Sequence, residues 1–150
     1  MNLKFTFFFG AISLLIACAN QQQETKTSKL PTETSLTNCY RYINNKDTVL
    51  LNTTYVNGFI SGTLVYNFYE KDKNKGTIQG KMTGDILFAD YSFNSEGVQS
   101  IRPLAFKKIG GNFVEGFGET INTNGKAFFK NKDSLNFNHS IVLKPFDCKH

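Results

Sequence analysis

The sequence predicts an all-β domain, an antiparallel meander closed into a small up-and-down barrel of eight or nine strands. Apolar and polar residues alternate along several segments, so that Leu64, Tyr66 and Phe68 share one face of a strand. Turn signals such as Asn57-Gly58 and Asn124-Gly125 recur at intervals of roughly ten residues. No segment has the apolar periodicity of an amphipathic helix.

Each expected strand lies between two of these turn signals, and the alternation within the segment sets its buried face. In chain order, the expected strands and the turn signals that follow them are 38–44 (Asn44-Asn45-Lys46), 47–56 (Asn57-Gly58), 59–70 (Lys73-Asn74-Lys75-Gly76), 76–83 (Gly84-Asp85), 86–95 (Glu96-Gly97), 98–109 (Gly110-Gly111), 112–119 (Asn124-Gly125), 126–131 (Asn131-Lys132-Asp133) and 140–146.

Short links between these strands permit only antiparallel neighbours, because a parallel crossover needs a dozen or more residues. A closed barrel also removes exposed sheet edges, which favours it over the alternative, a two-sheet β-sandwich. Three strands begin with a recurring pattern of a glycine, one or more apolar residues and a second glycine. We expect the second glycines, Gly62, Gly80 and Gly116, to mark bends or bulges in the wall.

The start of the chain is an apolar stretch behind Lys4 that ends in Leu15-Ile16-Ala17-Cys18. This arrangement resembles the signal peptide and lipobox of a bacterial lipoprotein. The stretch is too short to span a bilayer, which takes roughly 20 residues, but it suits a signal-peptide core. By this resemblance, residues 1–17 are removed and Cys18 becomes a lipidated N-terminus that anchors the chain to a membrane of the cell envelope.

The segment after Cys18 is polar, and residues 18–37 are expected to be the lipidated cysteine and a flexible tether to a domain over 38–150. Ala19 does not match the inner-membrane retention signal of enterobacterial lipoproteins, so delivery to the outer membrane is favoured. Surface-exported lipoproteins of bacteroidetes carry acidic residues at this point, whereas this chain has Gln21, Gln22 and Gln23. This difference weakly favours a protein that faces the periplasm, with a surface-facing protein as the alternative.

With Cys18 assigned to lipid, Cys39 and Cys148 remain at the two ends of the domain. In an oxidising compartment they are expected to form one disulfide, with two free thiols as the alternative. The bridge would place the first and last strands side by side. The two histidines, His139 and His150, do not stand at a spacing typical of zinc sites, so we expect no metal and no cofactor.

The central part of the domain holds four distinctive segments, which are Tyr66 to Lys75, Gly84 to Tyr91, Phe93 to Gly97 and Ser100-Ile101-Arg102. In these segments the chain resembles a family of small bacteroidetes lipoproteins to which no activity is assigned. The resemblance covers most of the chain from Cys39 to Cys148 and implies a Cys-bridged β domain, but it brings no known activity, and we nominate no catalytic residue. The architecture is also similar to lipocalins, to the copper-resistance type lipoprotein barrel and to lysozyme-inhibitor lipoproteins. The chain lacks the paired-cysteine copper motif of the second group and gives no place for the Ser-Gly-x-x-Tyr signature of the third, so neither of these functions is carried over.

Arg102 is the residue most suggestive of a binding site, because it shares strand parity with Leu104 and Phe106 and would point into the barrel. A buried guanidinium needs a partner or a ligand anion. Candidate partners are Asp90, Glu96 and Glu115. The alternatives are a purely structural ion pair and a strand phase shifted by one residue, which would expose Arg102. We also expect Glu115 and Glu119 to be surface charges.

No nucleophile motif, phosphate loop or metal motif occurs, and the net charge of +5 is spread along the chain, which speaks against nucleic acid as a partner. Two functional hypotheses remain. The first is a non-enzymatic envelope module that binds a small amphiphile or anion, or another envelope protein. The second is a carboxylate-based hydrolase. Thr48 and Ser134 lie in short sequences that resemble the O-glycosylation signal of bacteroidetes.

Overall fold

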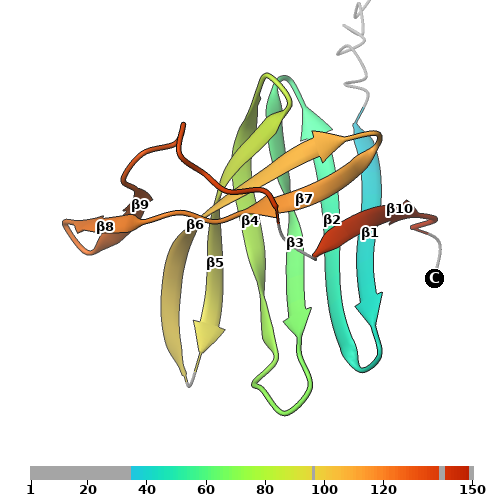
Figure 1. The fold of residues 1–150 in the computed structure, drawn as a ribbon, viewed down its shortest axis with the longest axis horizontal. Helices are drawn as coiled ribbons and strands as arrows, with labels where there is room; N and C mark the ends of the chain where they lie inside the picture. The colour runs from blue at the N-terminus through green and yellow to red at the C-terminus, as the bar shows by residue number, and fades with distance from the viewer. Residues whose placement is uncertain (1–34, 96, 139–140, 149–150) are drawn as a thin grey trace, which may run out of the picture. The chain divides into compact units, whose positions relative to one another are not determined.

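The computed structural model of the chain describes residues 35–95, 97–138 and 141–148. Eight of its strands form a closed barrel in the order β1-β10-β7-β6-β5-β4-β3-β2, and β8 pairs with β9 beside it (Figure 1). The prediction of an antiparallel all-β barrel is confirmed. The strands are β1 (Leu36–Asn44), β2 (Asp47–Val56), β3 (Phe59–Asn67), β4 (Asn74–Thr83), β5 (Ile86–Ser95), β6 (Val98–Ile109), β7 (Asn112–Gly116), β8 (Thr120–Thr123), β9 (Lys126–Phe129) and β10 (Val142–Phe146).

Two-residue links join most neighbouring strands, as the spacing of the turn signals predicted. Asn57 and Gly58 connect β2 to β3 with φ angles of 50° and 84°, and Asn124 and Gly125 connect β8 to β9 with φ angles of 52° and 78°. Two consecutive residues with positive φ are typical of the type I′ turn, whose twist matches that of antiparallel strands. The local sequence therefore determines the meander from β1 to β7.

β10 closes the barrel by pairing with β1 on one side and with β7 on the other. Cys39 of β1 lies opposite Phe146, and Val142 lies opposite Val114 of β7. The predicted disulfide joins Cys39 to Cys148, with 5.4 Å between the two Cα atoms. The first and last strands are therefore neighbours, as the cysteine positions predicted.

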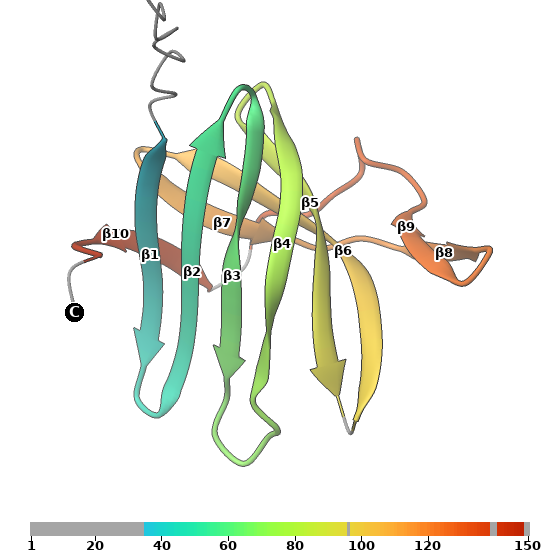
Figure 2. The ribbon, with the colours of Figure 1, turned by 180° about the vertical axis from the view of Figure 1, so that it is seen from behind.

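The assignment of residues 126–131 to the barrel wall is wrong. Residues 126–129 form β9 and pair with β8, a strand that the sequence did not predict, and this hairpin stands outside the barrel next to β6 (Figures 1 and 2). The reason is closure: β10 occupies the position beside β7, so no place in the wall remains for the segment between them.

Two other expected strands end early. β3 ends at Asn67 and not at residue 70, because the chain turns there: Lys71 donates its backbone N–H to Phe68, and Glu70 has a φ of 56°. β7 ends at Gly116 and not at residue 119, because Phe117 exchanges backbone hydrogen bonds with Asn136 instead of continuing along β6. This second departure directs the chain away from the barrel and towards the hairpin.

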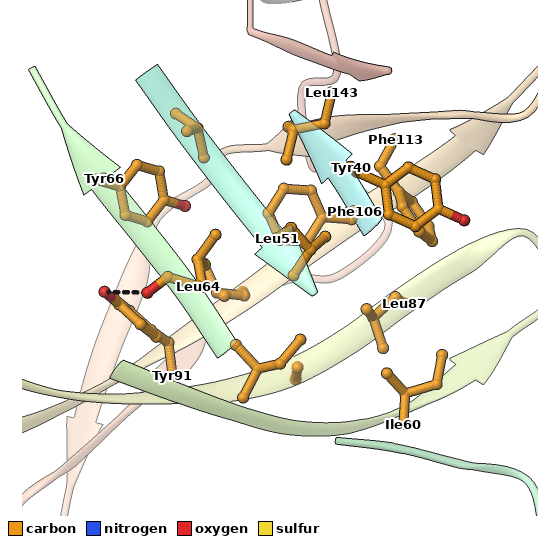
Figure 3. Packing of buried hydrophobic residues seen from close by; sticks show 14 residues of the cluster. Tyr40, Leu51, Ile60, Leu64, Tyr66, Leu87, Tyr91, Phe106, Phe113 and Leu143 are labelled. Carbon is orange, nitrogen blue, oxygen red and sulfur yellow. Dashed lines mark hydrogen bonds between the residues drawn. The ribbon is translucent and has the colours of Figure 1, made fainter. Parts of the chain in front are cut away.

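Apolar side chains from every strand of the barrel fill its interior. Figure 3 shows them converging, with Leu51, Leu64 and Phe106 in the centre, all fully buried. The buried cluster also includes Tyr40, Val49, Ile60, Tyr66, Ile78, Leu87, Ala89, Tyr91, Leu104, Phe113 and Leu143. Alternation predicted this face correctly, since these residues occupy every second position on most of the strands.

The glycines Gly62 and Gly80 do not mark bulges, because the strand registers run through them without an extra residue. These glycines instead allow the backbones of neighbouring strands to approach each other closely. A Cβ at Gly62 would overlap the carbonyl oxygen of Asn52, and one at Gly80 would overlap that of Phe88. At Gly116, a Cβ would meet the ring of Phe137, which packs over the end of β7. The expectation of bulges is corrected on this point.

Candidate functional site

The barrel is packed in its centre but hollow at one end. A cavity of about 330 Å³ lies near the β3–β4 link and the β5–β6 turn. Its volume is close to the lower limit of small-molecule sites, which range from about 300 to 1,000 Å³. Most of its lining side chains are aromatic or apolar, and three of them can be charged or carry an amide. The lining residues are Tyr66, Phe68, Asn74, Tyr91, Phe93, Arg102, Glu115, Phe117 and Ile141.

Arg102 points to this cavity, as its strand parity predicted. It lies on β6 opposite Tyr91 of β5, two positions from the fully buried Leu104. Its side chain is 39% exposed, so the guanidinium lies at the boundary between the core and solvent. The shifted strand phase, which would have placed Arg102 on the outer face, is therefore excluded.

Glu115 is the carboxylate that meets Arg102. Arg102 Nη2 lies 3.6 Å from Glu115 Oε1, and the glutamate side chain is only 2% exposed. Glu115 sits on β7 between Phe113 and Phe117, and the expectation that it is a surface charge is wrong. Side chains alternate between the two faces of β7, so Glu115 points to the interior of the barrel on the same side as Phe113, between Val114 and Gly116.

Tyr66 connects this ion pair to the opposite wall of the barrel. Its hydroxyl donates a hydrogen bond of 2.7 Å to Glu115 Oε1. A bond to a charged acceptor is roughly twice as strong as one between neutral groups. The Arg102 guanidinium also lies 5.2 Å from the ring centre of Tyr66 and 5.4 Å from that of Tyr91, within the range of cation–π attraction.

Tyr91 extends the aromatic part of the cavity. Its ring stacks on Phe93 with centroids 4.7 Å apart, and its hydroxyl donates to the carbonyl of Leu64 (Figure 3). The rings of Phe68 and Tyr66 contact each other in a tilted arrangement, with 5.8 Å between their centroids and 40° between their planes. The cavity therefore has one charged side, formed by Arg102 and Glu115, and one aromatic side.

Asp90, another predicted partner, does not reach Arg102. Asp90 lies on the outer face of β5 and pairs with Lys126 of β9 at 2.5 Å. Glu96 lies outside the described residues, as do Cys18, His139 and His150. Glu119 is exposed, as expected, and pairs with Lys130 at 2.9 Å. Of the two residues in glycosylation-like sequences, Ser134 is exposed and Thr48 is half-buried in β2.

Tyr66 and Tyr91 belong to the site, although the sequence analysis named neither of them as a candidate site residue. The sequence did contain a signal for them. Both hold inward positions among inward-facing residues that are otherwise mainly apolar, and each carries a hydroxyl that needs a partner when buried. Within the described ranges, no group of three or more His, Cys, Asp and Glu side chains could hold a metal ion, and no helix is long and apolar enough to cross a membrane.

The two cavity tyrosines are expected to make the protein less stable at high pH. Burial raises the pKa of Tyr91 from 10.0 to about 12 and the pKa of Tyr66 well above 10, with Glu115 adding to the effect and Arg102 opposing it. Because the folded-state pKa lies above the unfolded one, this stabilisation is complete below pH 10.0 and is lost as the pH rises towards about 12. Denaturant unfolding measured across this range should show the fall, and Tyr91→Phe should reduce it. An equally steep fall in Tyr91→Phe would show that Tyr91 is not responsible.

Comparison with protein-family models, with curated proteins and with solved structures finds no match for this chain.

Proposed function

We propose that this chain is a lipid-anchored envelope lipoprotein whose barrel binds a small amphiphilic anion without chemical conversion. The observation that carries the proposal is the guanidinium of Arg102, partly exposed at the side of an aromatic cavity. A guanidinium recognises carboxylates, sulfonates and phosphates through paired N–H donors. The rings of Tyr91, Phe93 and Phe68 supply the apolar surface for the rest of such a ligand.

Glu115 competes with a ligand anion for Arg102. It neutralises Arg102, so an anion must share the guanidinium with a carboxylate 3.6 Å away. The guanidinium has five N–H donors, and its exposed fraction leaves a side from which a ligand can approach. We therefore infer that the ligand gains affinity from two sources, the aromatic surface and Arg102, with Glu115 opposing the second.

A pair of fluorescent probes separates these two sources. 1-Anilinonaphthalene-8-sulfonate carries a sulfonate, whereas N-phenyl-1-naphthylamine has the same rings without the charge. Arg102→Met should weaken saturable binding of the sulfonate about tenfold, because a hydrogen bond to a charged group contributes roughly 1.5–3 kcal/mol. It should leave the neutral probe nearly unchanged. Glu115→Gln should strengthen binding of the sulfonate, because it removes the competing carboxylate.

Arg41→Met is the matched control, because Arg41 lies on β1 with its guanidinium over Phe146 and does not line this cavity. It should bind both probes as the unmodified chain does. Circular dichroism at the assay temperature confirms that each variant is folded. The binding proposal fails if neither probe binds saturably, and the role of Arg102 fails if both probes respond equally to its loss.

The anchor is tested separately. If Cys18 is lipidated, Cys18→Ser should move the protein from the membrane fraction to the soluble fraction or leave an uncleaved precursor, because no acyl chains would then attach it to the bilayer. We propose the outer membrane of a bacteroidetes-type envelope as the location. Fractionation and intact-mass measurement give the answer, and normal retention with a normal mature mass would contradict the anchor.

The hydrolase hypothesis has less support. Glu115 is the one carboxylate among the described residues that line the cavity, and Asp90 lies on the outer face. Mechanisms of the glycosidase type place two carboxyl groups on either side of the reacting bond. Binding without reaction therefore remains the better proposal.

A further inference from the structure

The two ends of the barrel differ in their exposed side chains. One end holds the start of β1 together with the β2–β3, β4–β5 and β6–β7 turns, as Figures 1 and 2 both show. The opposite end holds the β1–β2 turn, the β3–β4 link and the β5–β6 turn. We call the first of these the β2–β3 end and define its exposed surface by Leu36, Tyr55, Phe59, Lys81, Lys108 and Ile109.

Four of these side chains are apolar or aromatic and open to solvent. Their exposed fractions range from 42% for Tyr55 to 57% for Leu36 and Phe59, with Ile109 at 50%. Leu36 lies directly opposite Tyr55 in the β1–β2 ladder, and Phe59 begins β3 on the other side of the β2–β3 turn, so adjacent strands contribute three of the four. Single exposed apolar residues are ordinary on a protein surface, whereas a group of them marks a contact surface.

The charged groups of the β2–β3 end are mainly cationic. Lys81 and Lys108 are exposed, and neither ammonium group forms an ion pair with a described carboxylate. Lys81 lies opposite Phe59 in the β3–β4 ladder, with its ammonium group 4.2 Å from the centre of the ring. A third lysine, Lys107, is already paired with Asp85. Two cationic groups therefore remain beside the exposed apolar side chains.

The opposite end carries acidic groups as well as lysines. Glu70 and Asp72 are exposed in the β3–β4 link, and the Asp47 carboxylate accepts a hydrogen bond from the backbone of that link. An anionic surface repels such carboxylates, but it attracts the two lysines of the β2–β3 end. Of the two ends, the β2–β3 end is therefore the one that fits an anionic surface.

Chain order joins the β2–β3 end to the proposed anchor. Leu36 begins β1 at this end, and Cys18, the proposed site of the lipid, precedes it in the chain. A bilayer surface takes tyrosine side chains at the level of its headgroups, apolar side chains at the boundary with the acyl chains, and lysines beside anionic headgroups. All three kinds of side chain are present at this end.

We propose that the β2–β3 end contacts the surface of a bilayer that contains anionic phospholipid. This inference rests on the proposed lipid anchor, which holds the domain at the membrane. Leu36 and Phe59 enter the boundary between headgroups and acyl chains, and Lys81 and Lys108 attract the lipid phosphates. The interior cavity lies near the opposite end, so a ligand reaches it from the aqueous side.

A single introduced tryptophan measures this contact, because the chain has none of its own. Phe59→Trp reports on the β2–β3 end, and Tyr69→Trp, at a site 52% exposed in the β3–β4 link, is the matched control at the opposite end. Chain purified from membranes is reconstituted with vesicles of equal parts phosphatidylcholine and phosphatidylglycerol that carry brominated acyl chains. Emission of Phe59→Trp should shift to shorter wavelength and fall about twofold, because the side chain lies ~5–10 Å within the interface. Emission of Tyr69→Trp should stay as it is in water.

The part played by charge is tested in the Phe59→Trp chain. Lys81→Gln and Lys108→Gln should each lower the ratio of bound to free barrel end about fivefold, as expected for one lysine near an anionic surface. Lys75→Gln changes an exposed lysine on the same strand as Lys81 but near the opposite end, and it should have no effect. Quenching that is equally strong on phosphatidylcholine alone would overturn the role of the two lysines.

Flotation with the vesicles and intact-mass measurement report on the anchor separately. If the lipidated chain floats but Phe59→Trp is not quenched, or both tryptophans are quenched alike, the proposed contact is wrong while the anchor stands. If the chain carries no lipid and Phe59→Trp is still quenched, the contact holds without the anchor. A shift that appears without vesicles and grows with protein concentration would assign the β2–β3 end to self-association and overturn the proposal.

Discussion

Replacing Cys39 and Cys148 together with alanine is expected to lower the free energy of unfolding by about 4 kcal/mol. The bridge spans 109 residues. In the chain-entropy account, closing a loop of this length restricts the unfolded chain by up to ~4.7 kcal/mol, and measured values usually fall below that limit. Removing both cysteines avoids a free thiol, and the loss on reduction of the unmodified chain separates the bridge from the packing of the buried Cys39 side chain.

The structure also predicts which strand becomes less stable when the disulfide is removed. β10 is held to β1 by three residue pairs and to β7 by two, which makes it the most weakly paired strand of the barrel. It carries the fully buried Leu143. Without the bridge, backbone amides of β10 should exchange with deuterium much faster than those of β5, which forms eight residue pairs with β4 and ten with β6.

Denaturant unfolding with and without reductant measures the stability difference, and hydrogen exchange followed by mass spectrometry locates it. The unmodified chain should show the Cys39–Cys148 bridge under non-reducing conditions and should lose stability on reduction. Two freely alkylated thiols in protein isolated from an oxidising envelope, or an unchanged unfolding midpoint after reduction, would contradict the prediction.

The second large effect is expected at the ion pair, where the cost of removing each partner differs. Arg102→Met should lower the free energy of unfolding by about 2–4 kcal/mol, because the Glu115 carboxylate stays in the barrel wall without its counter-charge. Glu115→Gln should cost less. Its amide can still accept a hydrogen bond from Tyr66, and the partly exposed Arg102 can be solvated by water.

A double-mutant cycle measures this asymmetry. The double variant Arg102→Met with Glu115→Gln should be more stable than Arg102→Met alone, because no uncompensated buried carboxylate remains. Lys107 and Asp85 provide a control cycle at the surface: their groups lie 3.9 Å apart, the carboxylate is well exposed where Glu115 is buried, and removal of either should cost under about 1 kcal/mol. Equal costs for Arg102→Met and Glu115→Gln would show that the buried carboxylate is not the dominant group.

The strands of the meander could be predicted from the sequence because their causes are local. Alternation sets the buried face of a strand, and residues such as Asn57-Gly58 can adopt the positive φ angles that a two-residue turn requires. The same alternation placed Arg102 inside the barrel. The positions of Cys39 and Cys148 predicted that the first and last strands are neighbours, and hence that the sheet closes.

Only the tertiary structure decided the features that depend on contacts between distant segments. Closure by β10 excluded residues 126–129 from the wall and left them to pair with β8. The choice of Glu115 over Asp90 as partner of Arg102 depends on the β6–β7 register and on the face of each strand. The empty volume at one end of the barrel depends on how Phe68, Phe93 and their neighbours pack together. Strand alternation specifies which way a side chain points, but the atoms it meets are fixed by the register and spacing of strands far apart in the chain.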